Sequence, residues 1–400
     1  MPDARFFAAT PEEVGIDPEQ LDTVFQRAEQ EVRDGLLPSA QIAIARRGKI
    51  AGMRTFGRVT HEGRAAVATN DTLYVVFSAT KGITSAAAWL LIQEGKLDIG
   101  ARVAELVPEF GTNGKDIVTV EQLFTHTAGF PYAPFDPMDW RDRSKRLERF
   151  ARWKLNWEPG TRFEYHPTSS MWVVAELIER CSGMDFRHFI RTRITTPLGL
   201  PDLHVGLPSN LHDRVADITH VGSRPTPAEL QALGFPEIPE VEVTEDALQG
   251  FNQRAIREVG MPGGGGIMTA GDLALFYQAL LAEGRAPDGT PIWTQEVIRM
   301  ARQVRSGNLT DPIFHKKANR ALGIIIAGDR DRTYRGFGHT GSALMFGHNG
   351  AGGQVAWADP ETGISIGYCS NGLDRHPVRQ ARRVVAISSR AAVCALGSQP

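Results

Sequence analysis

A serine and a lysine three residues apart, Ser78 and Lys81, are the residues of this sequence best suited to covalent catalysis. They begin a segment whose apolar residues recur at helical spacing, and residues three apart share one face of a helix. A serine hydroxyl becomes a strong nucleophile when a base removes its proton, and partial desolvation lowers the pKa of a lysine enough for that task. Backbone N–H groups at the helix start also favour an oxyanion on the attacked carbonyl. The pattern predicts a serine hydrolase with Ser78 as its nucleophile.

The alternative interpretation of these residues is a helix-capping serine followed by a solvated lysine. Two observations favour catalysis. Ser78 to Lys81 is the only Ser-x-x-Lys sequence in the chain, and the apolar run Leu73–Phe77 directly precedes it. We therefore expect the helix start to be buried, and a buried lysine requires a functional or structural reason.

Further segments resemble the serine hydrolases related to class C β-lactamases, penicillin-binding DD-peptidases and family VIII carboxylesterases. Five segments carry the resemblance, in the order of that family: Phe77–Gly82, Leu123–Gly129, Glu158–Tyr165, Gly263–Thr269 and Gly347–Gly353. The resemblance implies that Tyr165 occupies the place of the tyrosine that moves a proton between nucleophile and leaving group. A phenol beside Lys81 suits that role, because its anion accepts a proton and its neutral form returns one. The alternative is a buried aromatic residue with a satisfied hydroxyl.

A second implied part of the site lies before the strand predicted at Gln354–Ala358. The resemblance places these residues where β-lactamases carry Lys-Thr-Gly, and we expect them to bind substrate: His348, Asn349 and Gly350. It also implies an oxyanion hole formed by the backbone N–H groups of Ala351 and Ser78. Gly338–Gly341 is a competing match, but the glycines and strand that follow His348 favour the later position.

Two departures from the family pattern bear on the substrate. The family's Tyr-x-Asn reads Tyr165-His166-Pro167 here, so the amide that helps to orient the lysine is absent. His348 replaces the lysine of the strand motif, which removes a permanent cation able to pair with a substrate carboxylate. Both departures favour neutral esters over β-lactams or D-alanyl peptides.

Other candidate sites are weaker. His126 lies in a Thr-His-Thr turn and is expected to satisfy loop backbone groups. Gly263–Gly266 is not followed by Lys-Ser or Lys-Thr, so we interpret it as a loop beside the cleft rather than a phosphate site. No His-Glu-x-x-His or Gly-x-Ser-x-Gly motif occurs, and we expect neither a metal, nor a cofactor, nor an α/β-hydrolase triad.

The elements that must position these residues divide the chain into two kinds of region. Apolar periodicity predicts sheet-covering helices over Pro18–Asp34, Thr269–Leu281 and Val378–Val393, and alternation predicts hairpins over Ala40–Gly57 and Gln354–Cys369. The middle of the chain is predicted to be helical over Val120–Phe124, Asp139–Leu155, Ser169–Arg180 and Asp185–Arg193. Leu200–Val259 shows weak periodicity and is expected to form loops and short helices over the cleft.

This order predicts an α/β (α+β) fold with an antiparallel sheet flanked by helices, as the resemblance to the β-lactamase and DD-peptidase fold also implies. We expect a discontinuous sheet domain, residues 1–100 and 265–400, and a mostly helical domain, residues 101–264. The active site is expected in the cleft between them.

Composition limits the partners. The 400 residues include 44 basic and 46 acidic side chains, a net charge of -2, which favours neither nucleic acid nor a membrane as partner. The three cysteines are far apart, and the first 15 residues lack the pattern of a secretory signal, so we expect a reduced, cytoplasmic protein. No apolar run is long enough to span a membrane.

These observations together predict a serine carboxylesterase that cleaves small esters through an acyl-enzyme on Ser78. Alternatives with the same chemistry are a β-lactamase, an amide or D-aminopeptidase-type hydrolase, and an acyltransferase. A silent ligand-binding module of the same fold is the alternative outside enzymes. The oligomeric state stays open.

Overall fold

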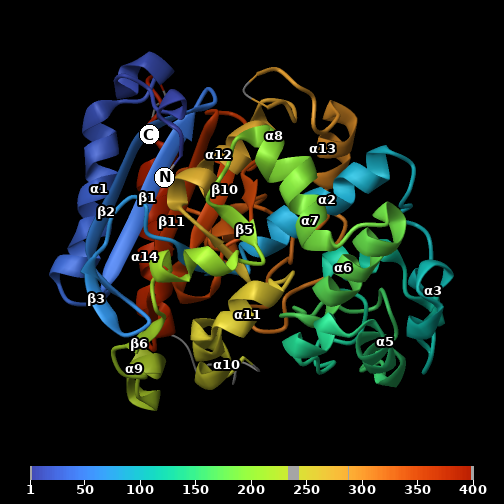
Figure 1. The fold of residues 1–400 in the computed structure, drawn as a ribbon. Coiled ribbons are helices and arrows are strands. Elements are labelled where there is room, and N and C mark those ends of the chain that lie inside the picture. Colours follow the sequence, from blue (N-terminus) through green and yellow to red (C-terminus); the bar gives the residue numbers. More distant parts are fainter. Residues whose placement is uncertain (1, 233–242, 287, 398–400) are drawn as a thin grey trace.

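A seven-stranded antiparallel sheet forms one side of the molecule (Figure 1). The structure is a computed structural model that describes residues 2–232, 243–286 and 288–397. The strand order is β3-β2-β1-β11-β10-β9-β8. The strands are β1 (Ser39–Arg46), β2 (Lys49–His61), β3 (Arg64–Val67), β8 (Ile325–Ile326), β9 (Phe346–Gly347), β10 (Val355–Asp359) and β11 (Ile364–Ser370).

Both predicted hairpins are present in this sheet as β1-β2 and β10-β11. They meet at the centre, where β1 pairs with β11 and Ile44 lies opposite Ile366. Every residue of β11 is buried, because helices cover both faces of the sheet there. The two ends of the chain are thus joined in one sheet.

Three predicted helices cover the sheet. Helices α1 (Pro18–Arg33) and α14 (Pro377–Ala392) pack together and share one apolar cluster with the sheet. Helix α12 (Ala270–Leu281) packs on β1, β10 and β11, and its buried residues belong to a second apolar cluster. Their bounds agree with the predicted ranges to within about two residues, because caps such as Asp17 on α1 mark the ends in the sequence.

The other side of the molecule is helical, as predicted (Figure 1). It contains α2 (Thr80–Gln93), α3 (Val103–Leu106), α4 (Val120–Thr125), α5 (Arg143–Arg152), α6 (Ser169–Ser182), α7 (Phe186–Ile190) and α8 (Thr196–Leu198). Helix α2 packs against α6, although residues 80–93 belong to the predicted sheet domain. The division at residues 100 and 265 therefore stays a prediction.

The predicted helix over Asp139–Leu155 is wrong in one respect. Asp142 interrupts it, because its side chain accepts hydrogen bonds from the N–H groups of Ser144 and Lys145 and so caps a new helix, α5. The residues before it form a separate 3-10 helix, Pro137–Arg141.

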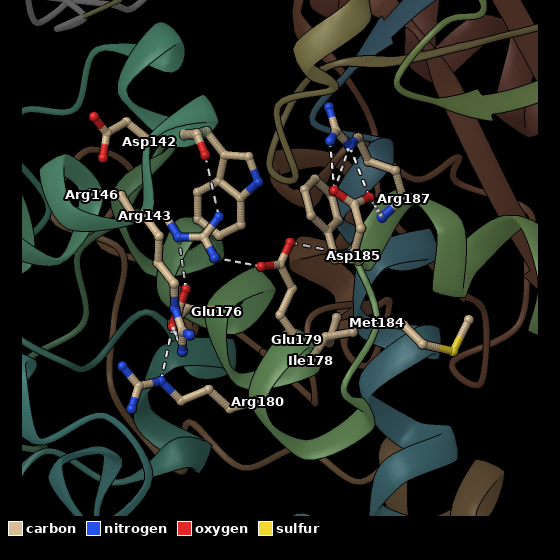
Figure 2. A network of polar contacts seen from close by, with 12 residues as sticks. Asp142, Arg143, Arg146, Glu176, Ile178, Glu179, Arg180, Met184, Asp185 and Arg187 are labelled. Carbon is tan, nitrogen blue, oxygen red and sulfur yellow. Dashed lines mark hydrogen bonds and ion pairs between the residues drawn. The ribbon is translucent and has the colours of Figure 1, made fainter.

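Buried ion pairs hold α5 against α6 (Figure 2). Glu176 is fully buried, and its carboxylate lies 2.9 Å from Arg146, 2.8 Å from Arg180 and 3.6 Å from Arg143. Arg146 also pairs with Glu179. A buried charge is tolerated when it is paired in this way, so we interpret the network as structural.

Short elements connect the two sides. β4 (Tyr74–Phe77), β7 (Gly266–Met268) and β5 (Leu203–Val205) form a three-stranded sheet, and β6 (Thr219–Val221) pairs with β12 (Gly372–Asp374). Short helices complete the region: α9 (Pro227–Ala232), α10 (Glu245–Gln249), α11 (Arg254–Val259) and α13 (Gln295–Ala301). Leu200–Val259 thus contains the expected short helices but also two strands, and residues 233–242 lie outside the described part.

Candidate active site

Ser78 lies in the turn that joins β4 to α2. Phe77, the last residue of β4, has a φ of +46°, in the left-handed region that side chains other than glycine rarely adopt. The Thr80 hydroxyl holds this turn, because it donates to the Phe77 carbonyl at 2.5 Å and accepts from Gly266 N–H in β7 at 2.8 Å. The turn leaves Ser78 partly exposed at the end of a buried strand.

Lys81 is fully buried beneath Ser78. Its Nζ lies 3.4 Å from Ser78 Oγ and donates to the carbonyls of Pro167 and Gly263, each at 2.7 Å. Burial lowers the pKa of Lys81, and the positive charge of Arg320 lowers it further, whereas Tyr165 opposes the shift. A neutral Lys81 would use both N–H groups on the two carbonyls, which leaves its lone pair for the Ser78 proton.

The structure brings Tyr165 to the same place. Lys81 Nζ lies 5.0 Å from the centroid of its ring. The buried Tyr165 hydroxyl has no protein partner at standard hydrogen-bond geometry in the described part of the chain. Burial would raise the pKa of Tyr165, but the charge of Lys81, with smaller effects from Ser78 and Arg320, lowers it below its ordinary value. The phenol is therefore suited to exchange a proton near Ser78.

The run from His348 to Gly350 continues β9 along the edge of β10. His348 N–H donates to Ala356 and Gly350 N–H donates to Gln354, both at 3.0 Å. Gly350 has ordinary extended backbone angles, but a Cβ there would lie 2.1 Å from the Val76 carbonyl oxygen. Only glycine lets this run lie so close to the strand that leads to Ser78.

The side chains of this run alternate in direction, as on any strand. His348 faces Tyr165, with their ring centroids 6.1 Å apart. The Asn349 amide points elsewhere, donating to the Gly336 carbonyl at 2.7 Å and accepting from Ala356 N–H at 3.3 Å. A substrate contact at Asn349 would therefore come from its backbone.

Two backbone N–H groups were expected to hold an oxyanion. In the described residues, neither Ser78 N–H nor Ala351 N–H donates a hydrogen bond to another protein group. Ala351 packs at the border of the same apolar cluster as the residues around Ser78, directly after Gly350. Both donors are thus available for a ligand.

Sequence reasoning missed Arg320. Its Nη1 lies 3.4 Å from His348 Nε2, and its guanidinium carbon lies 5.2 Å from the ring centroid of Tyr165. The argument that the site lacks a permanent cation is therefore wrong, because an arginine from the loop before β8 supplies one. A lone arginine in Asn319-Arg320-Ala321 gives no sequence signal for this, since only the tertiary fold places it beside His348.

His348 itself is neutral. Burial lowers its pKa well below the ordinary value, with Arg320 and Lys81 adding to the shift. Its Nδ1 lies 2.8 Å from the Asn349 carbonyl and donates to it, which leaves Nε2 as the acceptor that faces Arg320.

The residues after Tyr165 support the loop around it. His166 Nε2 accepts from Phe130 N–H at 3.1 Å, and burial lowers the pKa of His166 to about 4. His166 N–H donates in turn to His126 Nδ1 at 3.2 Å, which agrees with the structural role expected for His126. The carbonyls of Pro167 and Gly263 hold Lys81 where the family's asparagine amide would help.

Neither a ligand cluster nor a membrane helix is found in the part of the chain that the structure describes. No three His, Cys, Asp or Glu side chains are grouped as metal ligands there. No helix among those residues is both long and apolar enough to span a bilayer.

Comparison with known proteins gives the family. The beta-lactamase family model matches residues 24–389. This chain belongs to the beta-lactamase family. Among curated relatives, "Esterase/beta-lactamase LipL" of Mycobacterium tuberculosis is 30% identical over 321 residues, 76% of this chain and 70% of LipL.

Solved structures confirm the predicted fold of this beta-lactamase-family hydrolase. A family VIII carboxylesterase superposes with a TM-score of 0.76 at 27% identity, covering 94% of this chain and 99% of the other. A penicillin-binding protein homologue from Caulobacter crescentus gives 0.75 at 30% identity, with the same coverage. The fold is that of β-lactamases and penicillin-binding proteins.

Proposed function

We propose that this protein is a serine carboxylesterase that acts through an acyl-enzyme on Ser78. The observation that carries the proposal is the position of Lys81: its Nζ lies 3.4 Å from Ser78 Oγ, and two carbonyls fix its other hydrogen bonds. The buried Tyr165 hydroxyl completes a proton-transfer pair with Lys81, whose Nζ lies 5.0 Å from the centroid of the Tyr165 ring.

In the acylation step, the Lys81–Tyr165 pair, with Tyr165 as the phenolate, takes the Ser78 proton onto Tyr165 as Oγ bonds to the ester carbonyl carbon. The carbonyl oxygen becomes an oxyanion, which the N–H groups of Ser78 and Ala351 stabilise. When the tetrahedral intermediate collapses, the bond to the alkoxide breaks, and Tyr165 returns the proton to give the alcohol.

Deacylation reverses the proton movement. A water molecule gives its proton to the same pair and bonds to the acyl carbon. The intermediate then breaks its bond to Ser78 Oγ, which regains a proton, and the carboxylic acid leaves. No cofactor takes part in these steps.

Two observations support an ester substrate. The first is chemical: His348 is neutral, so the histidine itself offers no charge, and its Nε2 accepts from Arg320, which engages one N–H of that cation. The second is the similarity to LipL and to a family VIII carboxylesterase, whose names both refer to esterases. We place the acyl or alcohol group near His348 and the backbone of Asn349 and Gly350.

Arg320 favours a second candidate function. A guanidinium beside the strand motif is suited to a substrate carboxylate, as a β-lactam or a D-alanyl peptide would present. Hydrolysis of such amides would use the same nucleophile and the same proton-transfer pair, and transfer of the acyl group to an alcohol would make the protein an acyltransferase.

Comparison of kcat/KM on three substrates tests this choice. We expect p-nitrophenyl butyrate to be hydrolysed far more efficiently than nitrocefin or a D-alanyl-D-alanine peptide. Faster turnover of nitrocefin or of the peptide would instead support the second candidate. Ester formation with an added alcohol would reveal transferase activity.

A further inference from the structure

Cations and imidazoles lie around the Tyr165 ring. Lys81 comes from α2, Arg320 from the loop before β8, and His348 from the run after β9. His126, at the end of α4, lies against the Tyr165 ring in a tilted arrangement with centroids 4.7 Å apart, and His166 follows Tyr165 in the sequence. In residues 2–232, 243–286 and 288–397, no carboxylate is hydrogen-bonded or ion-paired to Lys81, Arg320 or Tyr165. Asp311 acts on Arg320 only from a distance.

Arg320 is held firmly in this group. Its N–H donates to Ser306 Oγ at 2.9 Å, and its carbonyl accepts from Arg305 N–H at 2.8 Å. Its guanidinium lies 5.4 Å from the centroid of the Phe163 ring and 5.2 Å from that of the Tyr165 ring. The Nε atom is buried and has no hydrogen-bond partner among the described residues. A cation whose guanidinium is partly buried in this way is costly unless negative charge lies nearby.

Among the described residues that hydrogen-bond to Arg320 or lie against its guanidinium, only Tyr165 has a side chain that can become an anion. We infer that Arg320 is a positioning residue that holds Tyr165 in its ionised form and His348 in its neutral form. The inference rests on the proposed function, because it concerns the proton-transfer pair of that mechanism. It assigns a role to a residue outside all five family-like segments.

Chemistry explains why an arginine suits this role better than a second lysine. Lys81 exchanges a proton during the reaction, so its charge is not constant. A guanidinium does not lose its proton in proteins, so Arg320 supplies a constant positive charge near the phenol. A nearby cation favours the charged form of a phenol and disfavours the charged form of an imidazole.

An absorbance titration at 295 nm tests the inference directly, because it follows tyrosine ionisation without turnover. The chain has six tyrosines. Burial raises the pKa of Tyr74, Tyr277 and Tyr368 far above the ordinary value, so these three stay neutral over the accessible range. The component that disappears in Tyr165→Phe therefore belongs to Tyr165. We expect Arg320→Met to raise its midpoint by about one to three pH units.

Arg302 offers a matched control. Its guanidinium also stacks on a ring, 4.4 Å from the centroid of Phe346, and its Nε is also buried without a hydrogen-bond partner in the described chain. Arg302→Met removes the same charge at a place that has no hydrogen bond or ring contact to Tyr165 in the described structure, so we expect an unchanged midpoint. Arg320→Lys restores a cation and should return the midpoint toward that of the wild type.

The pH profile of kcat/KM gives a second readout. Because the mechanism uses ionised Tyr165, activity rises with pH through the pKa of this residue, and Arg320→Met should move that rise to higher pH by the same amount.

An unmoved Tyr165 midpoint in Arg320→Met, or an equal shift in Arg302→Met, would overturn the inference. If Arg320→Met fails to fold by circular dichroism, Arg320→Gln, which keeps a hydrogen-bond donor but no charge, replaces it. A shifted titration in a protein without esterase activity would uphold Arg320 and reject the proposed function.

Discussion

At the scale of single residues, the reactivity of Ser78 depends on a lysine that cannot reach water. Lys81 is fully buried, and its hydrogen bonds to two carbonyls fix its Nζ toward the serine. The loop that carries Tyr165 is held by hydrogen bonds to two histidine rings: His166 accepts from Phe130 N–H, and His126 accepts from His166 N–H. The chemistry is therefore set by a few hydrogen bonds to the backbone, rather than by a carboxylate that orients the base.

Substitution of Lys81 should abolish most of the activity. We expect Lys81→Met, which has a similar volume but no amine, to lower kcat/KM on p-nitrophenyl butyrate about 10²- to 10⁴-fold. Lys115→Met is the control, because Lys115 is also fully buried and donates to the Thr112 and Trp153 carbonyls, far from the site in sequence. That variant should lose stability and keep its turnover. Full activity of Lys81→Met would contradict the assigned role of the lysine.

Local pattern predicted part of the site and missed the rest for physical reasons. The structure brings Ser78, Lys81 and Tyr165 together, since two lie at the same helix start and the third lies in a recognisable segment, and their catalytic roles stay a prediction. Arg320 carries no local signal, because its role comes from contacts between segments distant in sequence. The direction of the Asn349 side chain depends on strand register, which a single sequence does not specify.

At the scale of elements, the site depends on close packing between the end of β4 and the run that follows β9. The run after β9 lies against the end of β4, and Gly350 is the point of contact because a Cβ there would meet Val76 O at 2.1 Å. This contact positions Ala351 N–H relative to Ser78. The backbone of Phe77, at the end of β4, adopts a left-handed conformation that turns the chain sharply into α2 and so positions Ser78.

Gly350→Ala should therefore damage catalysis. The added methyl group must push the two strands apart, and a displacement near 1 Å at a reacting centre costs about 10²-fold in rate. Gly264→Ala is a suitable control, because its Cβ would meet Phe251 only at 3.7 Å, an ordinary contact. We expect a loss of kcat for the first variant alone, measured on p-nitrophenyl butyrate. Equal activities of the two variants would show that the contact does not position the site.

The prediction of elements succeeded where caps and periodicity agree. The sheet-covering helices and both hairpins were predicted correctly, because each has a repeated apolar pattern and turn residues at its ends. The helix over Asp139–Leu155 was predicted too long, since Asp142 acts as a cap inside it. The strands β5 and β6 were missed because each has three residues, too few for alternation to show.

At the scale of the whole molecule, buried ion pairs join segments from the two ends of the chain. Arg383 in α14 donates to Glu31 in α1 at 2.7 Å and to Asp374 in β12 at 2.9 Å. Asp374 also pairs with Arg379. Burial raises the pKa of Asp374, but Arg379, the His376 N–H and Arg383 lower it by more, so its pKa lies below the ordinary value.

This network predicts a pH-dependent stability difference. A carboxyl whose pKa is lowered on folding stabilises the protein above its unfolded pKa, about 3.9, and loses that effect as the pH falls through the folded value. We expect Asp374→Asn to lower the free energy of unfolding by about 3 to 5 kcal/mol at pH 7, with a smaller difference below about pH 3.9. Urea titrations of the wild type and Asp374→Asn at pH 7 and at pH 3 measure the difference in the free energy of unfolding at each pH.

A surface pair supplies the comparison for Asp374. Asp22 and Arg54 lie 3.0 Å apart with both side chains about half exposed. We expect Asp22→Asn to cost at most about 1 kcal/mol, because water screens an exposed pair. A cost for Asp374→Asn as small as this would show that the network does not join the chain ends.

The most direct test of the central claim is intact mass after treatment with a fluorophosphonate. The wild type should gain the mass of one phosphonyl group, Ser78→Ala should gain none, and Ser85→Ala, changed further along the same helix, should label like the wild type. Hydrolysis of p-nitrophenyl butyrate should follow the same pattern. An unlabelled wild type, or labelling and turnover that persist in Ser78→Ala, would contradict the assignment of Ser78 as the nucleophile.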